Sequence, residues 1–334
     1  MKRLSSICSH LLGVEKLTIA YVLFTLILIV IYGSSLPSVG SMLVLRGAAI
    51  GIIIVTHFTH HLLPHRLSLA WRTVPLLALL VWWYPETYDF CSQLPYLDHL
   101  FAAADQSLFG CQPSLEFARL LPHTLWSEAF NLGYYAYYYM MAAVIVFFLV
   151  CRTDDYDCAT TIFLGSFFLF YAIFDLLPVG GPQYYFKALA DIYGIDPFAL
   201  TGNTADTPAA IAAMKAATGG DTLFPPLGHY LQGHEAAMLP EVRGIFSQLV
   251  IGAQEFGEHP TAAFPSSHVG MSTVSMMLAW RSGNRRLFYI LLPLYLLLVC
   301  ATVYIRAHYL IDSICGFIVA VIFYLMFDHI TRKD

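Results

Sequence analysis

Two short segments near the C-terminus carry the residues best suited to chemistry. The first, FPSSHVG, runs from Phe264 to Gly270, and the second, RAHYLID, runs from Arg306 to Asp312. Each places a histidine at the mouth of a strongly apolar stretch. Two hydrophobic passes separate the histidines, so we expect both on one side of a membrane. His308 and Asp312 are four residues apart, which stacks them on one face of a helix, where the carboxylate would hold the imidazole in one tautomer.

This pair, with His268 opposite, suits phosphoryl transfer through a covalent histidine intermediate. Such an enzyme must attack phosphorus, protonate the leaving alkoxide and neutralise the equatorial oxygens. We predict His308 as the nucleophile, Asp312 as its orienter, and His268 as general acid and later general base. Ser266 and Ser267 stand at a predicted helix start, where hydroxyls, backbone N–H groups and the helix dipole bind phosphate.

The composition indicates a membrane protein. Of the 334 residues, 58% are hydrophobic and only 12% are charged, and the mean hydropathy is +0.66. Soluble domains carry roughly 25% charged residues. Apolar runs of membrane-spanning length recur along the chain, so we predict an all-α fold, a polytopic membrane helical bundle. The net charge of −5 argues against nucleic acid as a partner.

The apolar runs predict about eight spans. The third is the weakest, because it contains Arg72 and Pro75. The predicted spans are 17–33, 43–63, 70–86, 131–151, 159–177, 265–281, 287–304 and 309–327.

Basic residues predict the orientation of these spans. With both termini cytoplasmic, eleven Lys and Arg residues fall on inner segments and five or six on outer ones, as the positive-inside rule requires. Two long loops, near 86–130 and 178–264, and both histidine segments then lie on the outer face. The short inner loops suit a bacterial inner membrane with a periplasmic site, and a lumenal site is the alternative.

The first long loop predicts short helices in the membrane interface, because apolar residues alternate with charges from Leu97 to Phe109. Cys91 and Cys111 fall in this loop and could form a disulfide if it faces an oxidising compartment, but the sequence does not fix their separation. A tyrosine cluster follows at the mouth of the fourth span, either as an interfacial belt or as one wall of a groove for lipid access. Its members are Tyr134, Tyr135, Tyr137, Tyr138 and Tyr139.

The second long loop begins with the turn formed by Pro178, Gly180, Gly181 and Pro182. Asp175 lies just inside the preceding span. An acidic residue at that depth is costly, so it has either a site role or a structural hydrogen bond. Two helices are expected further along, at 208–218 and at about 241–256, and the second would cover the site.

The two histidine segments resemble signatures of a known family. The PSSH sequence ending at His268 is similar to the second signature of the type 2 phosphatidic acid phosphatase (PAP2) superfamily, and HYLID, followed by Gly316, to its third. The resemblance implies the catalytic roles given above for His308, Asp312 and His268, and a reaction without metal or cofactor. It also implies a six-helix core, which we map onto spans three to eight. The chain then divides into N-terminal helices, 1–68, and a catalytic membrane domain, 69–334.

Two phosphate-clamping positions of that family are not recognisable. Its first signature, a Lys and an Arg followed by Pro, has no counterpart ahead of the sixth span, and Ala301–Thr302 stands where phosphatases of the family have Ser-Arg. Arg306, Lys187 and Arg243 are candidate replacements. A phosphate monoester dianion demands several cations, whereas a diester carries one charge, so the sequence favours a diester donor.

Missing clamps are typical of the sphingolipid-synthase branch of the superfamily. The segments GPQYYF, LFGCQPS and AFPSSHVG most resemble its inositol phosphorylceramide synthase group. This resemblance implies a membrane phospholipid donor, phosphatidylinositol, and a ceramide-like acceptor. The candidate phosphate- and substrate-binding residues are Ser266, Ser267, Arg306, Asp175, Gln183, Tyr184 and Tyr185.

Two other functions remain open. One is a lipid phosphate phosphatase acting on phosphatidate, a polyprenyl diphosphate or a phosphorylated headgroup. The other is a proton-coupled transporter, although both histidines stand at span mouths rather than at mid-membrane. No metal site is predicted, since no HExxH pattern occurs and the histidines at 57, 60, 61 and 65 lack an accompanying cysteine or carboxylate.

Overall fold

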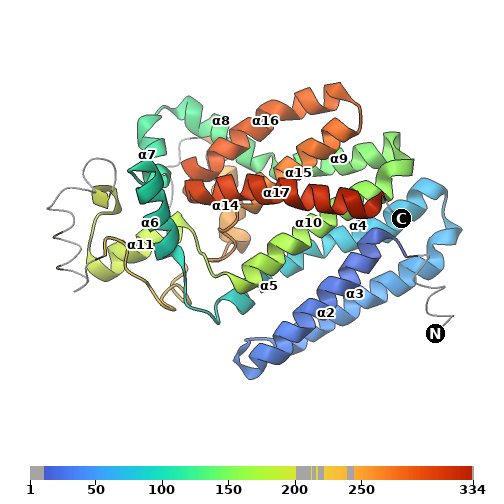
Figure 1. Cartoon of the computed structure of the whole chain (residues 1–334), viewed down its shortest axis with the longest axis horizontal. Coiled ribbons are helices and arrows are strands. Elements are labelled where there is room, and N and C mark those ends of the chain that lie inside the picture. Colours follow the sequence, from blue (N-terminus) through green and yellow to red (C-terminus); the bar gives the residue numbers. More distant parts are fainter. Residues whose placement is uncertain (1–10, 201–211, 213–215, 217–221, 239–243, 333–334) are drawn as a thin grey trace.

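The computed structural model describes residues 11–200, 212, 216, 222–238 and 244–332, and within them every regular element is helical. This confirms the predicted polytopic helical bundle (Figure 1). The longer helices are α2 (Gly13–Tyr32), α3 (Val39–Thr59), α4 (His65–Ala78), α9 (Tyr137–Cys151), α10 (Tyr156–Leu176), α15 (Ser267–Arg281), α16 (Arg285–Tyr304) and α17 (Leu310–Thr331). The shorter helices are α5 (Leu80–Cys91), α6 (Asp98–Phe109), α7 (Pro113–Leu120), α8 (Thr124–Tyr135), α11 (Pro182–Tyr193) and α14 (Ile245–Gly257).

Among the residues that the structure describes, six segments are long and apolar enough to cross a membrane, or seven if one bent pair counts as a span, where the sequence predicted about eight. The fourth predicted span is that bent pair, α8 and α9, which meet at 42°. The sixth is the 15-residue α15, which at 1.5 Å per residue is shorter than the roughly 30 Å hydrocarbon core. The six segments are Gly13–Ser35, Val39–Leu62, His65–Cys91, Thr153–Leu176, Arg285–Tyr304 and Leu310–Thr331.

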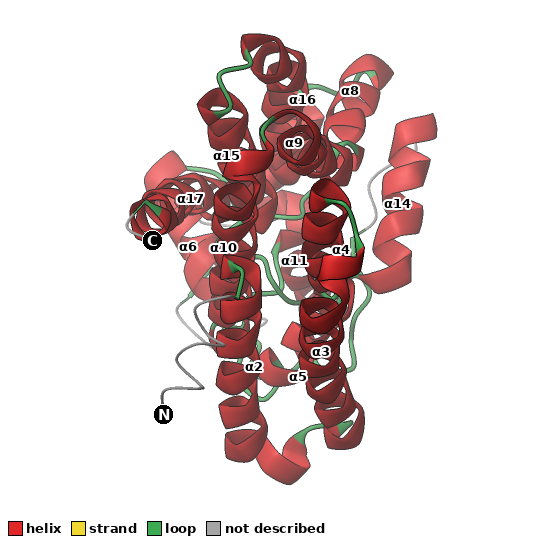
Figure 2. Cartoon of the chain, turned by 90° about the vertical axis from the view of Figure 1, so that its right-hand side faces the viewer, coloured by secondary structure: helices red, strands yellow, loops and turns green. Residues whose placement is uncertain are grey.

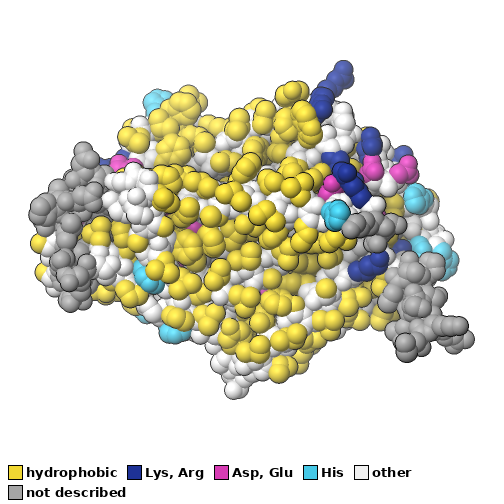
Figure 3. Space-filling view, viewed as in Figure 1, with side chains coloured by type: hydrophobic (Ala, Val, Ile, Leu, Met, Phe, Trp, Pro, Cys, Tyr) yellow, Lys and Arg dark blue, Asp and Glu magenta, His cyan; other side chains and the backbone are white. Residues whose placement is uncertain are grey.

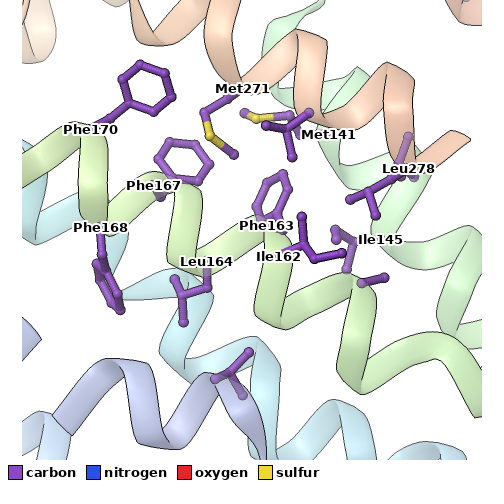
Figure 4. Packing of buried hydrophobic residues seen from close by; sticks show 14 of the residues in the cluster. Met141, Ile145, Ile162, Phe163, Leu164, Phe167, Phe168, Phe170, Met271 and Leu278 are labelled. Carbon is purple, nitrogen blue, oxygen red and sulfur yellow. The ribbon is translucent and has the colours of Figure 1, made fainter. Parts of the chain in front are cut away.

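Helix α10 forms the centre of the bundle. In its span 78% of the residues are buried, against 28–33% in the other five. Its sequence is apolar on all sides, as expected of a helix with neighbours all round. Phe163 and Phe167 of α10 face Met141 of α9 and Met271 of α15 (Figure 4). The two histidine segments are thus built onto an apolar core.

The N-terminal helices α2 and α3 lie together on one side, away from α8 and α16 (Figure 2). Buried ion pairs join them to the core. Glu15 of α2 accepts hydrogen bonds from Arg72 of α4, at 2.8 Å from Nε and 2.5 Å from Nη2. Arg46 of α3 pairs with Glu86 of α5 and donates to Thr25 of α2 at 3.2 Å. Arg72, which weakened the third predicted span, is therefore satisfied by a carboxylate.

The surface is that of an integral membrane protein. Hydrophobic side chains cover a broad band of the face in Figure 3, with Lys and Arg gathered at the end where α2 begins and α17 ends. Val30 and Val44, for example, are 82% and 72% exposed. Such contiguous apolar surface matches the lipid interior rather than water.

The first long loop folds into short helices, as the sequence predicted. Leu100 and Leu108 of α6 are exposed, whereas Asp98 and Asp105 are buried. Most of the helix expected at 208–218 lies outside the described residues. The expected cover helix is α14, and it packs against α8, where Glu128 accepts from the backbone N–H groups of Phe246 and Ser247.

We expect Arg46→Met to lower stability by about 3–5 kcal/mol, because it leaves the Glu86 carboxylate buried without a counter-ion. The double variant Arg46→Met/Glu86→Leu removes both charges and should recover most of that loss. Thermal unfolding of the purified protein in detergent measures both effects. Arg332→Met is the control and should change little, because the Arg332 side chain is 69% exposed and its partner Asp328 also pairs with Arg281. A double variant as unstable as the single one would contradict this account.

Candidate functional site

The starts of α15 and α17 meet at a close backbone contact. The N–H of Ser266, the N-cap of α15, donates to the carbonyl of Asp312 in the first turn of α17 at 3.0 Å. One turn further on, a Cβ at Gly316 would come within 2.4 Å of the Ser266 carbonyl oxygen. Only glycine permits this approach, which accounts for the glycine after the HYLID segment.

This contact brings the two histidines together. His308 Nε2 lies 3.3 Å from His268 Nδ1, and the ring centroids are 5.5 Å apart. The sequence therefore predicted correctly that the two rings converge. Their direct contact leaves no room for phosphorus between the two nitrogens, so a substrate must part them.

The orientation of His308 comes from a main-chain carbonyl. His308 Nδ1 donates to the Ala263 carbonyl at 2.8 Å, so Nε2 carries the lone pair that faces His268. Asp312 Oδ2 lies 3.9 Å from Nδ1, beyond hydrogen-bond distance, and accepts from the Tyr309 N–H at 2.9 Å. Asp312 thus caps the start of α17, and its predicted role as orienter of His308 stays a prediction. Ala262 holds a left-handed backbone, with φ of 63°, a costly conformation that aims the next carbonyl at His308.

His308 is 3% exposed. Burial lowers the pKa of His308 to about 4, and the hydrogen bond to the Ala263 carbonyl opposes this shift only in part. The ring is therefore neutral at pH 7, with a free electron pair on Nε2.

Two tyrosines enclose His268. The centroids of Tyr134 and Tyr137 each lie 4.6 Å from that of His268, with the Tyr134 ring stacked at 24° and the Tyr137 ring tilted at 43°. Tyr134 belongs to α8 and Tyr137 to α9, so the two tyrosines lie on either side of the bend between these helices. Tyr138 and Tyr139, by contrast, are 70% and 62% exposed. The predicted tyrosine cluster is thus divided between the site and the outer surface.

Two carboxylates that the sequence analysis did not place in the site hold His308's segment. Asp105 accepts from the N–H groups of Leu310 and Ile311, at 2.9 and 3.0 Å, and so caps α17. Asp98 accepts from the hydroxyl of Tyr309 at 3.2 Å. Burial raises the pKa of Asp98 and of Asp105 to about 6, against the hydrogen bonds that lower it. Their seven-residue spacing, which puts both on one helix face, was the available signal.

Asp98 also fixes the turn before α11, through the N–H groups of Gly180 (2.9 Å) and Gly181 (2.7 Å). Gly181 has a φ of 103°, which side chains rarely adopt, and a Cβ there would come within 2.7 Å of the Ala307 carbonyl oxygen. The GPQYYF segment is thereby held against the residue that precedes His308.

The predicted phosphate-binding serines lie at the start of α15. Ser266 is fully buried and its hydroxyl accepts from the Val269 N–H at 3.3 Å. Ser267 and His268 occupy the first helical turn, whose N–H groups have no helical partner. Those N–H groups and the Ser267 hydroxyl are suited to anionic oxygens.

Arg306 is 7% exposed, and its backbone is left-handed, with φ of 66°. Its guanidinium lies against Met238, with Nη1 3.1 Å from the sulfur, and against the Phe198 ring at 5.8 Å. Its Nε has no hydrogen-bond partner among the described residues. Burial lowers the pKa of Arg306. A buried guanidinium with so few acceptors retains the capacity to bind an anion.

Gln183 is joined to the same segment, since its N–H donates to the Arg306 carbonyl at 3.0 Å. The other predicted residues have structural contacts. Tyr185 is buried and donates to the Pro225 carbonyl at 3.0 Å, and Tyr184 packs against Tyr96 and Leu231. These two contacts anchor α11 in its loop.

Asp175 faces the N-terminal helices. Its Oδ2 accepts from the Tyr21 hydroxyl of α2 at 3.5 Å, and its Oδ1 has no partner within the described chain. Of the two roles left open for Asp175, these contacts fit the structural hydrogen bond.

Cys91 and Cys111 are both free. Cys91 is buried with its sulfur 3.2 Å from the Thr261 hydroxyl, so the disulfide expected in an oxidising compartment is not formed. No group of three or more His, Cys, Asp or Glu residues suited to a metal ion occurs among the residues described.

A neutral pair occupies the position where the family resemblance led us to look for arginine. Thr302 is fully buried, and its hydroxyl lies 3.0 Å from that of Ser313 on α17. Its carbonyl accepts from the His308 N–H at 3.0 Å. Thr302 thus positions the His308 backbone without adding charge.

The fold and the site define a helical membrane protein with two facing histidines at helix starts. A family model described as the PAP2 superfamily matches residues 99–326. The chain belongs to that superfamily, and so is a membrane lipid enzyme of the phosphatase or phosphotransferase type. The comparisons with curated proteins and with solved structures gave no match.

We expect Asp105→Ala to destabilise the protein by about 1–3 kcal/mol, because two buried N–H groups of α17 lose their acceptor. Activity should fall as well, since Leu310 and Ile311 are the second and third residues after His308. Asp191→Ala, at an exposed pair with Lys187, is the matched control and should be nearly neutral. Thermal unfolding and turnover on the same preparations check this. Equal stability of the two variants would show that the hydrogen bonds from Asp105 to the start of α17 do not stabilise the protein.

Proposed function

We propose that this protein is a lipid phosphotransferase that moves a phospho-headgroup from a glycerophospholipid to a lipid alcohol. We take phosphatidylinositol as the donor and ceramide as the acceptor, as in the inositol phosphorylceramide synthases that the GPQYYF, LFGCQPS and AFPSSHVG segments resemble. The observation that carries the proposal is a facing histidine pair with few cations beside it. Among the described residues, no lysine or arginine hydrogen-bonds to either ring.

The chemistry follows from the positions of the two nitrogens. In the first step, the Nε2 lone pair of His308 forms a bond to phosphorus, the bond from phosphorus to the diacylglycerol oxygen breaks, and that oxygen takes a proton from His268. In the second step, His268 removes the proton of the acceptor hydroxyl, whose oxygen attacks phosphorus as the phosphorus–nitrogen bond breaks. The anionic donor itself favours the protonated form of His268.

The two rings must separate for this to happen. In-line displacement puts nucleophile and leaving oxygen on opposite sides of phosphorus, whereas the rings are in contact at 3.3 Å. The N–H groups of the first turn of α15 and the Arg306 guanidinium are then available to the equatorial oxygens.

Exclusion of water favours transfer over hydrolysis. Val250 of α14 is 1% exposed and packs in one apolar cluster with Tyr134, Ile305 and Ala307. This cluster covers the chain just before His308. A site closed in this way favours an acceptor that arrives from the lipid phase.

We also propose a topology in which both termini are cytoplasmic and the histidine pair faces the outer, periplasmic or lumenal side. The basic side chains at the α2-start and α17-end of the molecule support it. Residues 69–334 then form the catalytic domain, and 1–68 an accessory pair of helices.

The proposal predicts that purified protein supplied with inositol-labelled phosphatidylinositol and ceramide will form labelled inositol phosphorylceramide. His308→Ala should reduce this by more than about 10³-fold, because no other group can form the covalent intermediate. The control is His259→Ala, which removes a histidine of the second long loop that pairs with Glu235, and this variant should retain activity. Rapid release of inorganic phosphate from phosphatidate, without transfer to ceramide, would instead establish a phosphatase.

The pH profile tests the state of the nucleophile. Because burial lowers the pKa of His308 to about 4, the neutral form persists well below pH 6.5. The acidic limb of kcat/KM should therefore lie near pH 4 to 5 rather than near the ordinary histidine value of about 6.5. Initial rates between pH 4 and pH 8 measure it. An acidic limb centred at 6.5 would mean that the attacking group is not a buried neutral imidazole.

A further inference from the structure

One carboxylate beside the histidine pair has no part in the chemistry described above. Glu258 follows α14 directly and precedes the PSSH segment. Its side chain is half-buried, and each oxygen has one neutral donor. Oε1 accepts from the Tyr134 hydroxyl at 3.2 Å, and Oε2 accepts from Gln183 Nε2 at 3.3 Å.

These two donors connect Glu258 to both catalytic rings. Tyr134 stacks its face on His268, so the carboxylate stands one phenol ring away from the predicted general acid. Gln183 donates its backbone N–H to the carbonyl of Arg306, two residues before His308. A group bound at Glu258 would therefore lie beside a phosphoryl group held between the histidines.

The carboxylate has acceptor capacity to spare. An ionised carboxylate offers about four lone-pair directions, and the neutral donors around Glu258 occupy only part of them. Burial raises the pKa of Glu258, while side-chain hydrogen bonds from Gln183, Tyr134 and Gln254 oppose that shift. No lysine or arginine pairs with it in the described part of the chain. A ligand that donates hydrogen bonds would complete its coordination.

The surroundings suit the hydroxyl groups of a polyol. Tyr134 stacks one face on His268 and presents its hydroxyl to Glu258. Phenol, amide and carboxylate together offer both donors and acceptors, which match neighbouring hydroxyls of a polyol.

We propose that Glu258, positioned by Gln183 and Tyr134, is the specificity-determining subsite that binds the hydroxyl groups of a polyol headgroup on the donor lipid. This inference rests on the proposed function, because it places the headgroup beside the phosphorus that His308 attacks. It adds a residue that selects the donor.

The test compares two diester donors, phosphatidylinositol and phosphatidylethanol, which share the phosphate charge but differ in headgroup hydroxyls. Release of diacylglycerol from each is followed with the purified full-length protein in mixed micelles, a readout that registers transfer and hydrolysis alike. Glu258→Gln should lower kcat/KM for phosphatidylinositol by roughly 10- to 100-fold, the value of a hydrogen bond to a charged group, and leave phosphatidylethanol nearly unchanged. Glu235→Gln is the matched control, since its carboxylate also accepts from a tyrosine hydroxyl, that of Tyr88, at 2.8 Å.

A loss of equal size on both donors would overturn the proposal, because Glu258 would then act only through Tyr134 and His268. No loss on either donor would overturn it too. If Glu258→Gln does not fold, Gln183→Met replaces it, with the same selective loss expected.

A binding measurement separates this proposal from the proposed function. Inositol 1-phosphate should raise the Tm of the wild-type protein more than inorganic phosphate does, and the difference should vanish in Glu258→Gln. If the difference is present while no diester is turned over, the phosphotransferase proposal fails and the subsite stands. If it is absent, the subsite fails whatever the reaction.

Discussion

The hydrogen bond between the Ser266 N–H and the Asp312 carbonyl ties the first turns of α15 and α17 together, and the site depends on it. Each of these turns stands next to one of the two facing histidines, so the distance between the rings follows from the distance between the helix ends. Gly316 makes this contact possible, because any Cβ there would meet the Ser266 carbonyl. The main chain sets where each ring is attached before any substrate arrives, while the rings, in contact at 3.3 Å, must still turn apart to admit phosphorus.

Several buried polar groups at the start of α17 are paired, as a membrane interior demands. The N–H groups at the start of α17 are satisfied by Asp105, and the Tyr309 N–H is satisfied by Asp312. The carbonyl of Ala263 receives the His308 ring N–H. The strained backbone of Ala262 persists because these bonds over-determine the segment. The catalytic ring is thus held by capping and main-chain interactions rather than by an ion pair.

The sequence was sufficient for the bundle and for the meeting of the two histidines. Apolar runs define spans because a lipid interior accepts little else, and two passes between His268 and His308 return the chain to the same side. The partner of His308 could not be predicted, since it depends on how the loop turns at Ala262. Asp98 and Asp105 were also missed, because a short helix with leucines on one face normally buries the leucines. Here the two aspartates are buried and the leucines exposed, because the aspartates accept hydrogen bonds from backbone N–H groups. Asp175 could be narrowed only to two roles, because a sequence does not show which neighbour a span faces.

Charge explains which phosphate suits such a site. Near the backbone of His308 lie the carboxylates of Asp98, Asp105 and Asp312, while Thr302 and Ser313 replace a cation with neutral hydroxyls. Coulomb repulsion from fixed negative groups scales with the ligand's charge, so it is twice as large for a monoester dianion as for a diester anion. The positive potential near this segment comes from helix N–H groups and from the buried guanidinium of Arg306, which together match a single negative charge. The carboxylates that cap α17 therefore support the proposed diester donor, because negative groups disfavour the doubly charged phosphates that a cation-rich site would attract.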